Sequence, residues 1–247
     1  MRHQYKVQLF WSGRDEALTR QGESLWTFTS LLARLHPLLG ALAPVTREGD
    51  LLPPLSDARE AAALLERNEI AWATGEQQHT TRKVVLALDR ADDAPVECTL
   101  VVGMPRPVIE ELWMPERLEV LVRDDADPEI VRPDVLLQIL YAGVQAFAPD
   151  WGYVGTTAHP TPPTPLYSEG RPVTGWMTYL SHAYPAHAAV LQDPAMFYVI
   201  DQRGHIVVAH PELFDAGVRA HRDAVATVRD ALAAAGVFGA PQAQGAR

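Results

Sequence analysis

The sequence predicts an α+β fold, in which helices pack on a mainly antiparallel β-sheet within a single domain. Two pairs of apolar segments flank short turns, as the strands of hairpins do. Segments with helical spacing lie between groups of strands and do not alternate regularly with single strands. The 247 residues suffice for one sizeable core. We therefore expect one domain over residues 1–238 and a flexible C-terminal tail over residues 239–247.

The first elements are expected to be a strand and a helix. QYKVQLFW, residues 4–11, is rich in aromatic and branched residues, which favours a strand. Apolar residues at helical spacing predict a helix over about residues 14–35, which Pro37 ends. Residues 40–55 contain proline and glycine and predict a connection. Ser56 is then expected to open a short helix, DAREAAALLERN.

The middle of the chain predicts three strands. KVVLALD (83–89) and VECTLVVG (96–103) flank the turn RADDAP, which indicates a hairpin. RLEVLVRD (117–124) alternates between apolar and polar residues in the same way. Such alternation is typical of antiparallel strands with one buried face, so these segments should form one half-buried sheet.

The last third predicts two helices, a strand and a second hairpin. Pro133 suits the first turn of a helix over residues 133–147. Five prolines in residues 158–172 predict a loop with extended backbone. MTYL (177–180) is a candidate strand, and MFYVI and HIVVAH flank a turn that ends in Gly204. A final helix is expected over about residues 217–235, with glycine as its stop signal.

The composition excludes several classes of protein. The formal charge of −10 repels nucleic acid and anionic lipid and attracts basic partners. A single cysteine, Cys98, excludes an internal disulfide and suits a reducing compartment. There is no cleavage signature and no apolar run of ~18 residues that could span a membrane. We expect a cytoplasmic protein with neither nucleic acid nor membrane as its partner.

The candidates for catalysis are histidines. The sequence contains no phosphate loop, dinucleotide fingerprint, nucleophile elbow or paired-cysteine motif, so we expect no cofactor and no metal. His182 and His187 flank a proline, and His205 and His210 bracket one strand, on opposite faces if the strand is regular. A histidine-dependent hydrolase or metal enzyme stays the alternative function. His221 lies on the apolar stripe of the last helix and suits a hydrogen-bonded core histidine.

Acidic residues form three groups near the ends of the central strands. If the strand ends share one edge of the sheet, the groups form one acidic patch, and otherwise they are solvated turns. Tryptophan and methionine within a charged rim are typical of a protein-binding surface. The groups are Asp89, Asp92 and Asp93; Glu110, Glu111, Glu116 and Glu119; and Asp124, Asp125, Asp127 and Glu129. The expected apolar contacts are Trp113 and Met114, with Trp151 as a further anchor.

The sequence resembles the immunity protein 52 family at three places. The first is the opening, YKVQLFWSGRDEALTRQGESLWTFTSLLARLHP, with Trp11 and the step Arg14-Asp15-Glu16. That step could also be a site at a strand-to-helix turn, but capping plus an ion pair is the simpler interpretation. The second is Gly175-Trp176-x-x-Tyr179-Leu180. The third is RGHIVVAHPELFD, which contains Gly204, followed by a helix with His221.

The resemblance implies a bacterial immunity protein, which is not an enzyme. Such proteins neutralise a cognate polymorphic toxin, and this family is associated with toxins of a restriction-endonuclease fold that secretion systems, such as type VI, deliver between cells. The implied partner is a nuclease with a basic surface. The charge of −10 agrees with this partner, since an acidic protein is steered quickly to a surface that binds phosphate.

Overall fold

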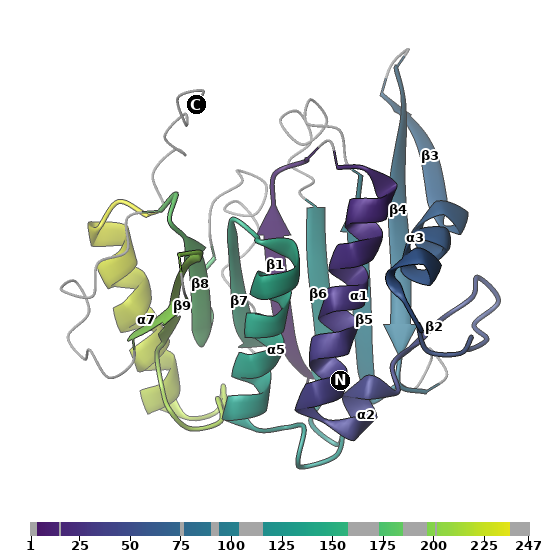
Figure 1. Cartoon of the computed structure of the whole chain (residues 1–247). Coiled ribbons are helices and arrows are strands. Elements are labelled where there is room, and N and C mark those ends of the chain that lie inside the picture. The colour runs from purple at the N-terminus through teal and green to yellow at the C-terminus, as the bar shows by residue number, and fades with distance from the viewer. Residues whose placement is uncertain are drawn as a thin grey trace.

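The computed structural model confirms an α+β domain with a ten-stranded antiparallel sheet (Figure 1). The structure describes residues 4–14, 16–74, 77–89, 94–103, 116–157, 173–184, 197–200 and 202–237. The strands are β1 (Gln4–Trp11), β2 (Ala43–Pro44), β3 (Glu69–Thr74), β4 (Gln77–Ala87), β5 (Val96–Val102), β6 (Glu116–Arg123), β7 (Trp151–Thr156), β8 (Met177–Ser181), β9 (Phe197–Ile200) and β10 (Gly204–Val208). The described helices are α1 (Leu18–Leu35), α2 (Pro37–Gly40), α3 (Ala58–Arg67), α5 (Pro133–Phe147) and α7 (Arg219–Ala234).

The strand order places the first strand in the middle of the sheet. The order is β2-β4-β5-β6-β1-β7-β8-β10-β9, and β3 pairs with β4 off this path. β1 pairs with β6 on one side and with β7 on the other, and both pairs are antiparallel. The N-terminal strand therefore joins two groups of strands that come from different parts of the sequence.

Several predicted elements are confirmed. The bounds of β1 and α5 are the predicted ones, and β5 and β6 differ from the prediction by one residue at most at either end. The β4–β5 and β9–β10 hairpins also form. Their sequences carry clear alternation or turn residues, so local pattern and tertiary packing agree there.

The beginning of α1 differs from the prediction. The helix begins at Leu18 instead of Arg14, and its N-cap, Ala17, makes no side-chain capping bond. Ser12, which the sequence offers as a cap for this helix, lies several residues before its start, and the Ser12 backbone N–H donates to Asp150 Oδ2 at 2.7 Å. In α3 the cap is Asp57 and not Ser56, since the Asp57 carboxylate accepts the N–H of Glu60 at 2.7 Å.

Some strands were not predicted or were predicted too short, and two predictions concern residues that the structure does not describe. The strands β2, β3 and β7 were not predicted, and β4 begins six residues before the predicted start at Lys83. The first half of β4 was missed because its residues QQHTTR are polar and show no strand pattern. β7 was missed because it contains two glycines. The proline-rich loop 158–172 and the tail 239–247 lie outside the described residues.

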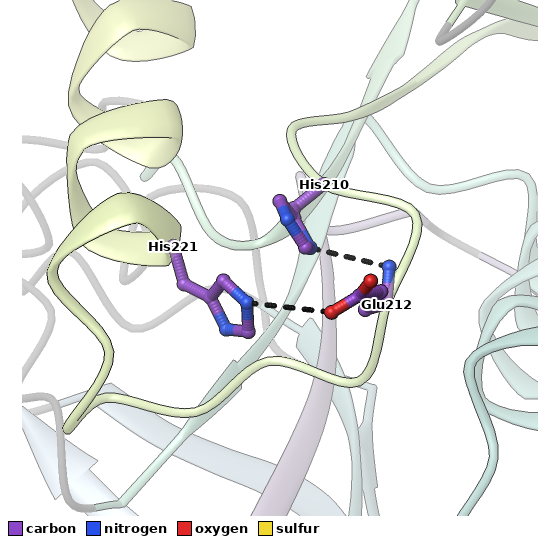
Figure 2. Close-up of side chains that lie close together, drawn as sticks. All are labelled: His210, Glu212 and His221. Atoms are coloured by element: carbon purple, nitrogen blue, oxygen red, sulfur yellow. Dashed lines mark hydrogen bonds and ion pairs between the residues drawn. The ribbon is translucent and has the colours of Figure 1, made fainter.

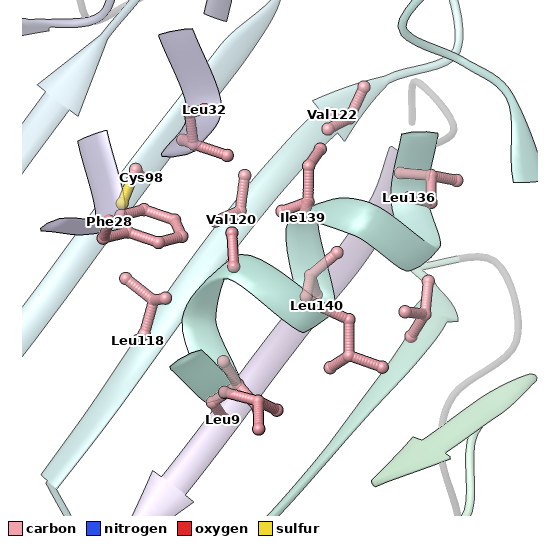
Figure 3. Packing of buried hydrophobic residues seen from close by; sticks show 14 of the residues in the cluster. Leu9, Phe28, Leu32, Cys98, Leu118, Val120, Val122, Leu136, Ile139 and Leu140 are labelled. Carbon is pink, nitrogen blue, oxygen red and sulfur yellow. The ribbon is translucent and has the colours of Figure 1, made fainter. Parts of the chain in front are cut away.

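One face of the sheet packs against α1, α3 and α5 (Figure 1). Leu9 of β1 and Leu118 of β6 are buried with Phe28 of α1 and Ile139 of α5 (Figure 3). The contact is close, because a Cβ on Gly143 of α5 would lie 2.1 Å from Leu9 Cδ1. The core thus explains why a helix interior contains a glycine there.

The opposite face carries a second core under α7. Val228 and Leu232 of this helix cluster with the strand residues Phe10, Leu180 and Val207. The apolar residues next to these three in sequence within the strands belong to the first core. Because successive strand residues point to opposite faces, α7 lies on the face away from α1 and α5. In the described part of the chain, the apolar cluster under α7 draws its strand residues from β1, β7, β8 and β10.

Candidate functional site

Asp89 of the first predicted acidic group and the third group lie at the same end of the sheet, on the lower side of Figure 1. Val96 at the start of β5 pairs with Val122 near the end of β6, so the β4–β5 turn and the loop after β6 are neighbours. The N–H of Arg123 donates to Pro95 O at 2.9 Å, which closes this corner. We call the carboxylates there the acidic end: Asp89, Asp124, Asp125, Asp127, Glu129 and Asp134.

The second predicted acidic group does not join this patch. Glu116 pairs with Trp11 at the opposite end of β6, is 3% exposed, and accepts the N–H of Gly103 at 2.6 Å. Glu119 lies in the middle of β6, where it contacts Lys6 and Gln8. The single patch of three groups is therefore wrong, because β6 separates the second group from the third. Asp92, Asp93, Glu110 and Glu111 lie outside the described residues.

Internal ion pairs neutralise only part of the acidic end. The guanidinium of Arg123 donates to Asp125, with Nε 2.7 Å from Oδ1. Arg132 lies 2.9 Å from both Glu129 and Asp134, and it lowers the pKa of the Asp134 carboxyl. Residues 88–89, 94–95 and 123–134 contain six carboxylates and two guanidiniums, so these described residues together carry an excess of negative charge.

Trp151, the one predicted apolar anchor that the structure describes, does not add to this surface. Trp151 is 5% exposed and stacks on Phe10 with ring centroids 4.1 Å apart. Its burial gives it a packing role in the second core, so the proposed surface leaves it out. Trp113 and Met114 lie outside the described residues.

The tryptophan of the second resembling stretch holds the third stretch in place. Trp176 Nε1 donates to the carbonyl oxygen of His210 at 2.6 Å, and its indole lies beside the ring of Phe214, with centroids 6.4 Å apart. The Phe214 ring lies 6.0 Å from that of His221. Trp176, Phe214 and His221 therefore form one buried contact group, although the first and the last are 45 positions apart in the sequence.

Tyr179 and the two glycines have packing roles as well. The Tyr179 hydroxyl donates to the carbonyl oxygen of Arg203 at 2.8 Å, and burial raises the pKa of Tyr179 to about 12. A Cβ on Gly204, whose φ is +154°, would lie 2.2 Å from Leu180 O. A Cβ on Gly175 would lie 2.3 Å from Val154 O. Both glycines permit close approach of neighbouring backbones.

Arg14 caps a helix, although not its own. Its guanidinium donates to the carbonyl oxygens of Phe147, at 2.9 Å, and Ala148, at the C-terminus of α5, where a cation complements the helix dipole. The carboxylate of Glu16 lies 3.8 Å away, and Trp11 stacks on Phe147 beside it. The arrangement supports the interpretation of this step as capping plus an ion pair. Asp15 lies outside the described residues.

The histidines meet in pairs that the sequence did not predict. The rings of His182 and His205 make an edge contact, with centroids 5.2 Å apart. The rings of His210 and His221 lie 4.0 Å apart, and the carboxylate of Glu212 joins them (Figure 2). His187 lies outside the described residues. His210 follows β10, which ends at Val208, so the alternation rule for strands does not place it.

The group of His210, Glu212 and His221 has the composition of a metal site but the wrong hydrogen bonds. Nδ1 of His210 accepts the N–H of Glu212 at 3.2 Å, and Nδ1 of His221 accepts the N–H of Asp215 at 3.0 Å. Each neutral ring therefore carries its proton on Nε2, which leaves that atom without a lone pair for a metal. A metal-binding histidine instead donates from its other ring nitrogen. The group fits a structural role for His221, which is buried.

We expect the thermal unfolding midpoint to be insensitive to divalent metals. Neither an excess of zinc nor a chelator should shift the midpoint by more than about 1 °C, since a ligand that binds only the native state raises it. Differential scanning calorimetry measures the effect, with a His210→Ala variant as the control for nonspecific binding. A rise that zinc produces in the native chain and not in the variant would contradict the hydrogen-bond argument.

A comparison with protein families places the chain among the immunity proteins. The sequence model described as immunity protein 52 matches residues 117–241, about half of the chain, and the chain belongs to this family. The match contains the second and third resembling stretches. The opening stretch lies before its first residue.

A solved structure shows the same fold over nearly the whole chain. The chain is similar to a Pseudomonas aeruginosa protein, titled T6SS protein PA0821, with a TM-score of 0.58 and 17% identity. The alignment covers 94% of this chain and 76% of that protein. The search of curated proteins gave no match. In the ranges that the structure describes, we find no helix with the length and hydropathy of a membrane span.

Proposed function

We propose that the chain binds a cognate secreted toxin and neutralises it by direct contact, without catalysis of its own. The family match over residues 117–241 is the observation that carries this proposal. The hydrogen bonds of His210 and His221 support it, because Nδ1 of each ring accepts a backbone N–H, which suits side chains with a structural role.

The acidic end supports a nuclease as the toxin. A nuclease must present cationic side chains to the phosphates of its substrate. The acidic end offers carboxylates that could occupy or lie beside such a groove, and the charge of −10 would speed the encounter. In this proposal the toxin has a restriction-endonuclease fold, and the chain acts in the cytoplasm of the producing cell.

The structural neighbour supports a delivery route. Its title describes a T6SS protein, which is a protein of the type VI secretion system. We infer that the toxin of this chain travels by the same kind of system. Isolation of the product of the adjacent toxin gene, and a pull-down with this chain, test the proposal directly. Failure to form a complex at micromolar concentration would refute direct binding.

Neutralising the acidic end should slow association with the toxin. The triple variant Asp124→Asn, Asp127→Asn and Glu129→Gln removes three charges and keeps the shape of each side chain. The new amide oxygen at position 127 can still accept the N–H of Glu129, which Asp127 Oδ1 accepts at 2.9 Å, and Asp125 stays to hold Arg123. We expect the association rate at low salt to fall roughly tenfold and to depend less on salt. Stopped-flow fluorescence or surface plasmon resonance measures both effects.

A matched variant controls for total charge. Glu23→Gln, Glu66→Gln and Asp230→Asn also remove three exposed carboxylates, from α1, α3 and α7. If the acidic end guides the toxin, this control should keep most of the native association rate. Equal slowing by both triple variants would show that only net charge matters and would remove the acidic end from the interface.

A further inference from the structure

The strands β3 and β4 form a ribbon that projects beyond the rest of the sheet (Figure 1). All six residues of β3 pair with β4, from Glu69↔Arg82 to Thr74↔Gln77. β5 pairs with β4 only from Arg82 onward. Residues 77–81 of β4 therefore pair with β3 alone among the described strands, and β3 is an edge strand.

The base of this ribbon is firmly attached to the helices. Arg82 donates to the side-chain oxygen of Gln21 in α1 at 3.3 Å, and it also forms an ion pair with Glu69. The N–H of Lys83 donates to the carbonyl oxygen of Asn68, the C-cap of α3, at 3.2 Å. These contacts fix the orientation of the ribbon relative to α1 and α3. Its outer edge is therefore preorganised for binding.

Within the residues that the structure describes, the outer edge of β3 lacks the usual protection against strand pairing. Natural edge strands carry lysines, prolines or bulges, or are very short. β3, EIAWAT, contains neither lysine nor proline, and its one charged residue, Glu69, is neutralised by Arg82. Ile70 is 44% exposed and Ala71 is also exposed. At the other edge, β9 has only four residues.

We propose that the edge of β3 binds the same edge of a second copy of this chain, in an antiparallel pair around a twofold axis. An antiparallel edge is complementary to itself under such an axis, because a residue i of one copy faces a residue j of the other, and residue j of the first copy faces residue i of the second. The two sheets then form one continuous sheet across the dimer. No strand in the described part of the chain occupies this edge.

The charge distribution favours a second copy over a basic toxin at this edge. Two chains of −10 repel one another, so they can approach best where the local charge is balanced. Residues 69–83 contain two glutamates, one arginine and one lysine, which cancel. A basic partner has no electrostatic attraction to a neutral edge and is attracted to the acidic end instead.

The dimer would leave the acidic end free. β4 runs from the ribbon toward the acidic end, and its stretch from Arg82 to Ala87 separates the near end of the ribbon from that end by roughly 17 Å. Each copy could then bind one toxin. The inference does not rest on the proposed function, since it concerns a different surface.

The test is the mass of the purified full chain in solution as a function of concentration. We expect light scattering after size exclusion to give a mass that rises from 27.2 kDa toward twice that value at submillimolar concentration. The variant with Ile70→Lys and Ala71→Lys places like charges across the twofold axis, and it should weaken the association roughly tenfold or more. Val199→Lys, at a 65% exposed position of the other edge strand, is the matched control and should behave as the native chain.

The other outcomes contradict the proposal. A native chain that stays at 27.2 kDa at every concentration would overturn it. So would a dimer that the β3 charges leave intact, or one that Val199→Lys weakens equally. Loss of toxin binding by the β3 variant, with a monomeric native chain, would assign the edge to the toxin. Hydrogen exchange of the native chain gives an independent readout, since protection of residues 69–74 should rise with concentration only if the edges pair.

Discussion

Replacing Trp176 by alanine is expected to lower the free energy of unfolding by about 3–5 kcal/mol. The side chain is 1% exposed, and it connects β8 to the segment after β10 through the bond from Nε1 to His210 O. Alanine would remove the indole, leave that carbonyl oxygen without its donor and open a cavity beside Phe214. Urea unfolding followed by circular dichroism measures the loss.

A matched substitution separates the stability effect of burial from that of removing any tryptophan side chain. Trp26→Ala in α1 removes the same side chain at a half-buried position and should cost clearly less. Equal losses at the two positions would contradict the role of Trp176 as the contact that joins the motif residues. The milder variant Trp176→Phe should keep toxin binding at temperatures where it is folded, because the residue is buried away from any partner.

Replacing Gly204 by alanine is expected to cost about 3 kcal/mol. The new Cβ would lie 2.2 Å from Leu180 O, and that oxygen belongs to the backbone of the paired strand β8, so it cannot move away alone. The φ of +154° adds strain for any residue with a Cβ. Thermal unfolding of the variant reports the combined effect.

The control for this prediction is Gly49→Ala. Gly49 also has a positive φ, +88°, but nothing lies within 4 Å of its Cβ position. Its substitution should cost only about 1 kcal/mol, which is backbone strain without a clash. If both variants lose the same stability, the close approach of β8 and β10 at Gly204 does not contribute to the cost of the substitution.

The parts of the fold that the sequence predicts are those with one strong local signal. β1 is rich in aromatic and branched residues, and α5 begins at a proline and carries an apolar stripe. β7 could not be predicted in this way, because it contains two glycines. One of them, Gly152, serves close packing, since a Cβ there would lie 2.4 Å from Leu9 Cδ2. The first half of β4 is stabilised by pairing with β3, which is not encoded in a local pattern.

The candidate site was predictable only as a set of residues. The acidic turns after β4 and β6 are visible in the sequence, but their meeting depends on the register of β5 against β6. The same register moves Glu116 to the far end of the sheet. Trp151 looked like an exposed anchor because α7, which covers it, lies about 70 residues later in the chain. The meeting of His210 with His221 depends on how the segment after β10 folds back onto α7.

Neutralisation of the toxin in living cells tests the central proposal most directly. The product of the adjacent toxin gene is expressed inside a host that lacks both genes, with or without this chain, and growth and DNA integrity are followed. We predict that the toxin alone stops growth and degrades DNA, and that the chain restores both while forming a stable complex with the toxin. If growth is not restored although both proteins are present and folded, the chain is not the immunity protein of that toxin.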